Sequence, residues 1–574
     1  MPDLAGAGPA LVAAVGLGLA APAALGQSDP LGEPFPAEFD LSSLRGASTG
    51  GGTLGFIYRG SKPRASAGRS IGGAHDWDGD GADELLLSEP NWEAEVLYRV
   101  GIGLVLYGRT GADWPVVSTY LGLDTWQVNR AISQQGWTGR NVAGVGDLNA
   151  DGVEDVCIDR YNGLFEVLYG DPTRPVGYDR LPLAEGRGTR FYPEEATYSV
   201  AAAGDVNGDG VDDAIFGGAM GQYEGVGYVV YGRAGSGPPA LDGRNLDGTN
   251  GFAISCNAYD NCGAGVAGVG DINGDGFDDF ATGAPRGATY FDPARRGAVY
   301  VVFGRDGAID PFPASLQFGD TTSVLGMVLH GQGIASAGRD LDAAGDVNGD
   351  GIADMVIASP DQEDASSRAF VVFGRADGAF PVEMNLSSLD GTDGFQMRAS
   401  VGGFAAAVAG LGDVNSDGID DIAIGGKGYD PDGSMADDNQ AFVVFGRADG
   451  QFPFMMDLST LDGTDGFRLD GRSVGGDVGW EVAGPGDVNG DGVNDIAVGA
   501  PGYAGGRGAV FVIFGRHPDN CPADLDADGE LTIFDFLTFG NLFDLMDPRA
   551  DFDGDGDFTV FDFLAFQNAF DAGC

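Results

Sequence analysis

Seven short stretches of this chain place oxygen-bearing side chains at the spacing that a hard cation requires. The stretch from Asp205 to Asp213 shows the pattern: Asp or Asn stands at positions 1, 3, 5 and 9, and Gly210 stands at position 6. Ca²⁺ takes six to eight oxygen ligands, and a short loop of alternating Asp and Asn supplies them around one sharp turn. The pattern therefore predicts a calcium-binding loop.

This loop occurs seven times at intervals of roughly 60 to 75 residues, and one fixed motif that recurs at a long period indicates a repeat architecture. A single copy is also explained by an Asx turn without metal, but seven copies with matching ligand positions favour metal binding, even if one loop stays empty. The predicted ligands are Asp76, Asp78, Asp80, Glu84, Asp147, Asn149, Asp151, Asp155, Asp205, Asn207, Asp209, Asp213, Asp271, Asn273, Asp275, Asp279, Asp346, Asn348, Asp350, Asp354, Asp413, Asn415, Asp417, Asp421, Asp487, Asn489, Asp491 and Asp495.

Two further loops near the C-terminus have the twelve-residue spacing of an EF-hand loop. Position 12 is Asp in both, in place of the usual bidentate Glu, which shortens the reach to the ion and predicts weak affinity. Each loop runs into an apolar segment, 534–543 or 561–570. The predicted ligands are Asp524, Asp526, Asp528, Thr532, Asp535, Asp551, Asp553, Asp555, Thr559 and Asp562.

Each of the seven repeats predicts four β-strands. A run of small residues, such as 142–146, precedes the loop and suits a strand crowded against a central axis. An apolar strand follows the loop, as in 495–499, and then a strongly β-prone strand that ends in Gly, as in 511–515. A fourth segment, clearest in 386–395, closes the unit. Seven such units predict an all-β, seven-bladed β-propeller with four-stranded blades, whose radial repetition leaves only short sheet edges.

The two ends of the repeat region predict closure of the ring. The seventh unit stops after its third strand at Arg516, while residues 40–57 copy the fourth-segment pattern ahead of the first loop. We infer that this N-terminal strand completes the last blade, because closure removes an open sheet edge.

The strand ending in Phe-Gly, the Gly-Ala-Pro step at Gly283–Pro285 and Gly499–Pro501, and the acidic loop together resemble FG-GAP repeats, the units of the integrin α-subunit propeller and its bacterial relatives. The resemblance implies a seven-bladed ring with up to seven Ca²⁺ ions in the loops between the first and second strands. Ser88-Glu89-Pro90 and Ala358-Ser359-Pro360 depart from the Gly-Ala-Pro step. The short interval between the second and third loops leaves no room for an inserted ligand-binding domain of the integrin kind.

Residues 521–574 resemble a bacterial dockerin, because both halves carry a calcium loop followed by Phe-Asp-Phe-Leu and the segment ends in Gly-Cys. The resemblance implies a small α-helical module with two Ca²⁺ ions that docks to a cohesin-like receptor or a cell-surface assembly through two similar faces. A module of this size buries little apolar surface, so the metal and a Cys521–Cys574 bridge would both support it. The alternative is a calcium-bound stabilising tail without a partner.

Composition and the N-terminus bear on compartment and partners. The formal charge of −55 argues against nucleic acid, which needs a basic patch. An apolar run before Gly26 resembles a secretory signal although it lacks a basic n-region; a misassigned start or an unstructured tail is the alternative. No later stretch has the ~20 apolar residues of a membrane span. These features predict a signal peptide at 1–26, linkers at 27–39 and 517–520, the propeller at 40–516, the C-terminal module at 521–574, and a secreted or cell-surface location.

Five cysteines fit an oxidising compartment if Cys256 pairs with Cys262 and Cys521 with Cys574, leaving Cys157 buried. A reduced chain with five thiols is the alternative.

The loops on the ring face opposite the calcium loops would then bind a ligand. Trp92, Trp137 and Trp480 fall in these loops, and so does the segment between Cys256 and Cys262. They suit a glycan or a protein ligand, although Trp side chains more often pack between blades.

The sequence offers no catalytic motif. His75, His330 and His517 lie in unrelated contexts, and no nucleophile elbow, HExxH helix or nucleotide-binding glycine loop is present. Two functions remain. The first is a secreted, calcium-binding adhesion or recognition propeller without catalytic activity, tethered through its C-terminal module. The second is an extracellular polysaccharide-acting hydrolase or lyase component that uses the opposite face of the ring.

Overall fold

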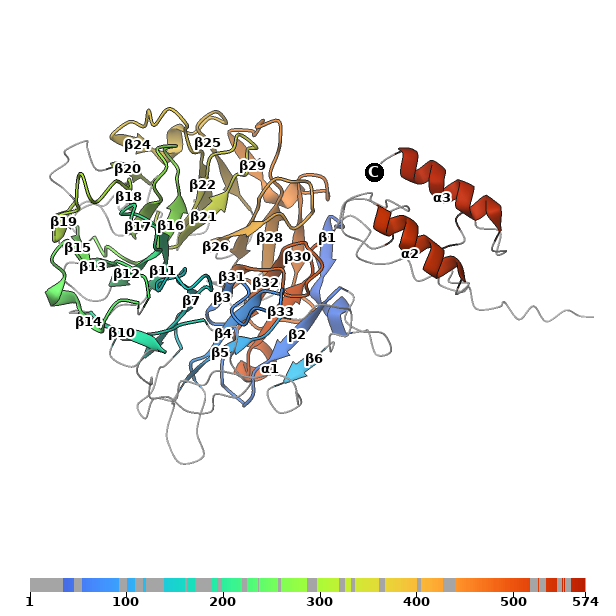
Figure 1. The fold of residues 1–574 in the computed structure, drawn as a ribbon, viewed down its shortest axis with the longest axis horizontal. Coiled ribbons are helices and arrows are strands. Elements are labelled where there is room, and N and C mark those ends of the chain that lie inside the picture. Colours follow the sequence, from blue (N-terminus) through green and yellow to red (C-terminus); the bar gives the residue numbers. More distant parts are fainter. Residues whose placement is uncertain are drawn as a thin grey trace, which may run out of the picture.

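The computed structural model describes residues 35–45, 54–91, 101–108, 117–119, 139–160, 163–170, 187–193, 199–218, 225–235, 237–256, 260–285, 297–318, 326–331, 336–360, 367–399, 404–426, 439–516, 525, 533–544, 550, 552 and 559–572. Seven β-sheets are arranged around a central axis, as Figure 1 shows, so the predicted seven-bladed β-propeller is confirmed. Two helices, α2 and α3, follow the ring in the chain.

The innermost strand of each blade comes directly before the acidic loop. These strands are β3 (Ile71–Ala74), β7 (Val142–Gly144), β11 (Ser199–Gly204), β16 (Val266–Gly270), β21 (Leu341–Gly345), β26 (Phe404–Gly412) and β31 (Val482–Gly486). Each contacts the innermost strand of the next blade, and β31 contacts β3. Small residues are required here: a Cβ added to Gly484 would lie 2.7 Å from the carbonyl oxygen of Gly410.

The second and third strands are packed between neighbouring blades on both faces, which explains their apolar sequences. The second strands are β4 (Glu84–Glu89), β8 (Val156–Arg160), β12 (Asp213–Gly218), β17 (Asp279–Ala284), β22 (Asp354–Ser359), β27 (Asp421–Gly426) and β32 (Asp495–Ala500). The third strands are β5 (Ile102–Leu106), β9 (Leu164–Leu168), β13 (Val226–Val230), β18 (Ala298–Val302), β23 (Arg368–Val372), β28 (Gln440–Val444) and β33 (Ala509–Ile513).

The fourth strands are β10 (Gly188–Tyr192), β15 (Gly251–Ser255), β20 (Gly326–His330), β25 (Gly394–Arg398), β30 (Gly466–Asp470) and β2 (Gly55–Arg59). Among the described residues, the first to fourth strands of a blade pair antiparallel with one another. In the seventh blade β2 pairs with β33, from Gly55 opposite Ile513 to Arg59 opposite Ala509. The predicted completion of the last blade by an N-terminal strand is therefore confirmed.

The prediction of four-stranded blades is incomplete, because six of the described sheets have a fifth, outermost strand. These strands are β1 (Glu38–Asp40), β6 (Val117–Thr119), β14 (Leu241–Asp242), β19 (Ser315–Gln317), β24 (Glu383–Asn385) and β29 (Met455–Asp457). Each comes from the unit that follows in the ring and pairs in parallel with the fourth strand of the blade before it, as β19 pairs with β15. The link between third and fourth strands thus covers the neighbouring blade's exposed edge.

Short helices complete the chain. The 3₁₀ helices η2 (Leu41–Arg45), η4 (Gly243–Asn245), η5 (Leu386–Ser388) and η6 (Leu458–Thr460) each follow a fifth strand, and α1 (Tyr503–Gly506) is a single turn. After the ring, α2 (Ile533–Asp544) and α3 (Val560–Ala572) pack through phenylalanines, with the rings of Phe539 and Phe566 stacked 4.5 Å apart.

The N-terminal segment enters the ring earlier than the predicted boundary at Asp40. Phe35 is buried, its ring stacks on Phe467 at 4.2 Å, and the guanidinium of Arg516 lies 4.7 Å above it. In the sixth unit the guanidinium of Arg447 lies 5.3 Å from the ring of Phe452. Phe35 therefore takes the place in the seventh unit that Phe452 takes in the sixth. The residues from Phe35 onward complete the seventh unit, although they lie far from Arg516 in the sequence.

Replacing Phe35 is expected to weaken the ring at this joint. The Phe35→Ala variant should lose ~3–5 kcal/mol of unfolding free energy, because it removes a buried aromatic side chain and leaves a cavity. Urea unfolding at a fixed calcium concentration measures the loss. The control is Phe454→Ala, because Phe454 is 62% exposed; equal losses in both variants would contradict the proposed role of this joint.

Candidate metal centres

The seven acidic loops connect the first and second strands of the seven blades, so they lie together at one end of the ring, here called the acidic end. The predicted sharp turn is present at position 6. Gly210 has φ +83°, a left-handed conformation that glycine adopts without strain.

The carboxylates at positions 1 and 5 hold the loop in shape. In the third loop, Asp205 accepts hydrogen bonds from the backbone N–H groups of Asp209 (3.0 Å) and Gly210 (2.7 Å). Asp209 accepts one from the N–H of Val211 at 3.1 Å. These bonds curl the chain so that the side chains of positions 1 and 5 share the inside of one turn. Each carboxylate oxygen keeps a lone pair for a cation.

The carboxylate at position 9 is fully buried in all seven loops. Asp279 accepts hydrogen bonds from the N–H of Ile272 at 3.1 Å and from the N–H of Gly304 at 2.7 Å. Gly304 is the glycine that ends the third strand, and a Cβ added to it would meet the carbonyl oxygen of Asp278 at 2.3 Å. The acidic loop and the Phe-Gly strand end are therefore one packing unit.

The burial of these carboxylates is the main reason to expect a cation beside them. Burial raises the pKa of Asp155 and Asp279 to about 8 and that of Glu84 to about 9, and neighbouring carboxylates in each loop raise it further. A buried carboxylate close to other carboxylates is costly unless a positive charge compensates it.

Several buried loop oxygens also lack a hydrogen-bond donor. They are Oδ1 of Asp78, Oε1 of Glu84, Oδ1 of Asn149 and Oδ1 of Asn489, at positions 3 or 9 of their loops. In the first loop, carboxylate oxygens of Asp76, Asp78 and Asp80 lie within 4.8 Å of one another. A set of carboxylate and amide oxygens with unused lone pairs fits Ca²⁺. The residues at positions 1, 3, 5 and 9 would hold the ion, and its charge would offset the repulsion among them.

The acidic residue at position 8 has a different role, which sequence reasoning missed. Asp212 accepts a hydrogen bond from the N–H of Asp147, the first residue of the preceding loop, at 2.8 Å. Asp278, Asp420 and Asp83 bind the N–H groups of Asp205, Asp346 and Asp487 in the same way, each at 2.8 Å. The last of these bonds joins the seventh blade to the first. An aspartate at position 8 therefore connects neighbouring blades. Its signal in the sequence was the acid found there in five of the seven loops, with Ala353 and Asn494 in the other two.

At the C-terminus the structure describes two of the ten predicted loop ligands with their side chains. The side-chain oxygen of Thr559 accepts a hydrogen bond from the N–H of Phe561 at 3.1 Å, and buried Asp562 accepts one from the N–H of Thr559 at 2.7 Å. This reciprocal pair is a capping box at the start of α3. The side chains of Asp524, Asp526, Asp528, Thr532, Asp535, Asp551, Asp553 and Asp555 lie outside the described part of the structure, as do Cys521 and Cys574.

Cys256 and Cys262 form a disulfide in the loop between the third and fourth blades, at the end of the ring opposite the acidic end, and Cys157 is a buried free thiol. Trp480 lies half-buried at the same end, below the guanidinium of Arg69 at 4.9 Å. Trp92, Trp137, His517 and residues 1–26 lie outside the described residues. No helix among the described residues is both long and apolar enough to cross a membrane.

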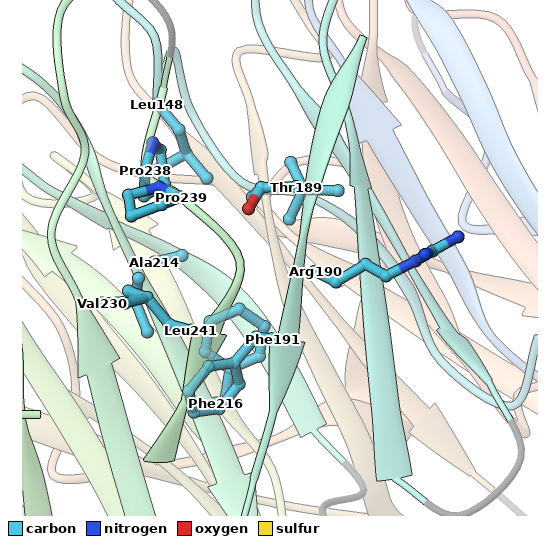
Figure 2. Close-up of a pocket in the computed structure, with 11 residues that line it drawn as sticks. Leu148, Thr189, Arg190, Phe191, Ala214, Phe216, Val230, Pro238, Pro239 and Leu241 are labelled. Carbon is cyan, nitrogen blue, oxygen red and sulfur yellow. The ribbon is translucent and has the colours of Figure 1, made fainter. Parts of the chain in front are cut away.

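A small cavity between the second and third blades lacks the converging polar groups of a ligand site. Figure 2 shows that apolar side chains, including Phe191, Phe216 and Leu241, form most of its lining, and that the guanidinium of Arg190 extends away from them. Few polar groups converge on it, so it is a gap in the packing between blades.

Comparison with known proteins agrees with the repeat assignment. The FG-GAP repeat model matches residues 263–302 and 478–513, which span the first three strands of the fourth and seventh blades. Integrin alpha-5 of Xenopus laevis is 30% identical over 229 residues, covering 38% of this chain and 19% of that protein. Integrin alpha-V of Gallus gallus is 31% identical over 179 residues, covering 30% of this chain and 15% of that protein.

A mouse phosphatidylinositol-glycan-specific phospholipase D is 26% identical over 179 residues, covering 30% of this chain and 20% of the enzyme. The matched part of the chain thus spans about a fifth or less of each of these relatives. The repeats and the closed ring together define an integrin-like FG-GAP β-propeller.

Proposed function

We propose that this chain is a secreted, calcium-binding adhesion or recognition propeller without catalytic activity, attached to a cell surface or a multiprotein assembly through its C-terminal module. The observation that carries the proposal is the set of seven buried position-9 carboxylates, each at the end of a loop built from oxygen ligands. Bound Ca²⁺ would stabilise the acidic end and leave the opposite end for recognition. Similarity to integrin α chains supports adhesion as the class of function.

The surface of the helix pair supports the proposed attachment. Ile533 and Leu537 on α2 are 65% and 58% exposed. Val560 and Leu564, at the equivalent positions on α3, are 63% and 46% exposed. Apolar side chains at the same positions of two related helices would give two similar faces for a cohesin-like receptor, because exposed apolar patches mark interaction sites.

The second candidate function is a polysaccharide-acting hydrolase or lyase component. Similarity to a phospholipase D is the observation that keeps it open, since the matching repeats also occur in an enzyme. Calcium binding by the acidic loops would leave few carboxylates for catalysis at that end.

Surface attachment and turnover separate the two candidates. The full chain and a variant lacking residues 521–574 are each added to cells or a glycan array, and bound protein and released sugar are measured. We expect binding without turnover, and loss of surface attachment but not of ligand binding in the truncated variant. Shortening of a glycan by the full chain would favour the second candidate.

A further inference from the structure

Three loops join at the end of the ring opposite the acidic end, where the seventh blade meets the first. We call residues 60–70, 476–481 and 501–508 the seam platform. Backbone hydrogen bonds connect its parts: the N–H of Ser66 donates to the carbonyl oxygen of Gly506 (3.0 Å), and the N–H of Gly502 donates to that of Gly476 (3.0 Å). The platform is thus one connected surface that spans the closure of the ring.

The backbone of the seam platform is strained. Arg64, Ser66, Asp477 and Ala504 have φ values of +65°, +58°, +61° and +50°, and at least one of them belongs to each of the three loops. Non-glycine residues adopt this left-handed region at a cost. Such residues cluster at binding and active sites, where the surrounding structure holds them in place.

Basic side chains gather on the seam platform of a chain whose formal charge is −55. Arg64 is exposed, and Lys62, Arg69 and Arg507 are half-buried. Neither Arg64 nor Arg507 has a carboxylate partner within the part of the chain that the structure describes.

Two buried carboxylates next to the seam platform, those of Glu89 and Asp159, accept hydrogen bonds from neighbouring groups. Glu89 accepts hydrogen bonds from the hydroxyl of Tyr58 at 2.9 Å and from the N–H of Ser61 at 2.7 Å. Asp159 accepts one from the N–H of Arg140 at 2.6 Å. The remaining carboxylates of the platform are those of Asp477 and Glu481.

Arg69 and Arg140 lie directly before β3 and β7, at the rim of the central axis. Burial lowers the pKa of Arg69, and the positive charge of Arg140 lowers it further, while Glu481 raises it. Because the innermost strands β3 and β7 contact one another, the two arginines lie at adjacent positions of the rim, with the carboxylate of Glu481 near Arg69. The ring of Trp480 lies 4.9 Å from the guanidinium carbon of Arg69, so an aromatic side chain stands next to this positive charge.

We propose that the seam platform binds an acidic polysaccharide, whose carboxylate or sulfate groups are bound by Arg64, Arg69 and Arg507. Arg69 comes directly before the innermost strand β3, and Arg64 and Arg507 lie on two loops that hydrogen-bond to each other. The charges are thus spread over neighbouring loops, which suits a ligand with repeated negative charges. Trp480 is half-buried under Arg69, and its exposed part would contact a sugar ring beside the charge. This ligand class rests on the proposed recognition function.

Titration calorimetry of the full chain at a fixed calcium concentration tests the site. The probes are a short oligogalacturonate, a heparin-derived oligosaccharide, a neutral maltooligosaccharide of equal length, and a polyglutamate peptide. We expect an acidic oligosaccharide to bind at least ten times more tightly than the neutral one, and binding to weaken with added salt. Binding of the uronate alone or of the sulfated sugar alone supports the proposal and identifies the acidic group.

The matched variants are Arg64→Ser/Arg507→Ser, the same pair with Arg69→Gln, and Arg233→Gln as a control. Arg233 is exposed at the acidic end, and its backbone N–H donates a hydrogen bond to the carbonyl oxygen of Leu148. We expect at least tenfold weaker binding in the first two and unchanged binding in the control. The double variant keeps half-buried Arg69, so it reports on the site even if the triple variant unfolds.

Three results would overturn the proposal: no binding of either acidic oligosaccharide, equal weakening in Arg233→Gln, or equally tight binding of polyglutamate. Cell attachment that persists without oligosaccharide binding would leave the recognition function intact and reject this site alone. Shortening of the oligosaccharide would reject the non-catalytic function and keep the site.

Discussion

Removal of divalent cations is expected to lower the melting temperature of the protein by ~10 °C or more. One site kept at a hundred times its dissociation constant stabilises the folded state by ~2.7 kcal/mol, and seven sites act on the same ring. Without the cations, the carboxylates at positions 1, 5 and 9 of each loop repel one another around a buried group. The hydrogen bonds from position 8 to the preceding loop connect these loops, so loss of order in one loop should weaken its neighbours.

Thermal unfolding with Ca²⁺, with EDTA, and with EDTA followed by excess Ca²⁺ measures this effect. Recovery of the original melting temperature in the third sample shows that chelation, rather than irreversible damage, caused the loss. Identical melting curves with and without EDTA would contradict a role for calcium in stabilising this fold.

The second large effect is expected from Asp279→Asn, which keeps the shape of a position-9 side chain and removes its charge. The new amide oxygen can still accept from the N–H of Gly304, but its NH₂ group cannot accept from the N–H of Ile272. In Ca²⁺ the variant should be ~3 kcal/mol less stable than the parent, because its loop no longer binds the ion. In EDTA the difference should shrink, since the substitution also removes a buried charge that has no counter-ion.

Chemical unfolding in both buffers gives the two differences. Asp247→Asn is the matched control, because Asp247 is an exposed turn residue that accepts a hydrogen bond from the N–H of Thr249. If Asp279→Asn destabilises the protein equally in both buffers, its carboxylate serves only the backbone hydrogen bonds. That result would contradict a metal ligand at position 9.

Local patterns predicted the strands of this fold well because the same sequence pattern recurs in all seven repeats. The small residues before each loop, the apolar strand after it and the Phe-Gly strand end all identify strands that the structure contains. The fifth strands were not predicted: they are two or three residues long, alternate exposed and buried positions where their burial is described, and pair with another unit. The entry of the chain at Phe35 was missed for a related reason. Its partners Phe467 and Arg516 are more than four hundred residues away in the sequence.

The sequence by itself determined which side chains form the acidic loops and that the chain folds as a ring of repeated sheets, because ligand spacing and strand periodicity are local properties. Only the tertiary structure decided the roles of similar residues within one loop. Asp278 and Asp279 are neighbours of the same type, but Asp278 reaches the preceding blade while Asp279 is buried under its own. Tertiary structure also brought the basic residues of distant loops together at the closure of the ring, because the pairing of β2 with β33 makes the two ends of the repeat region neighbours.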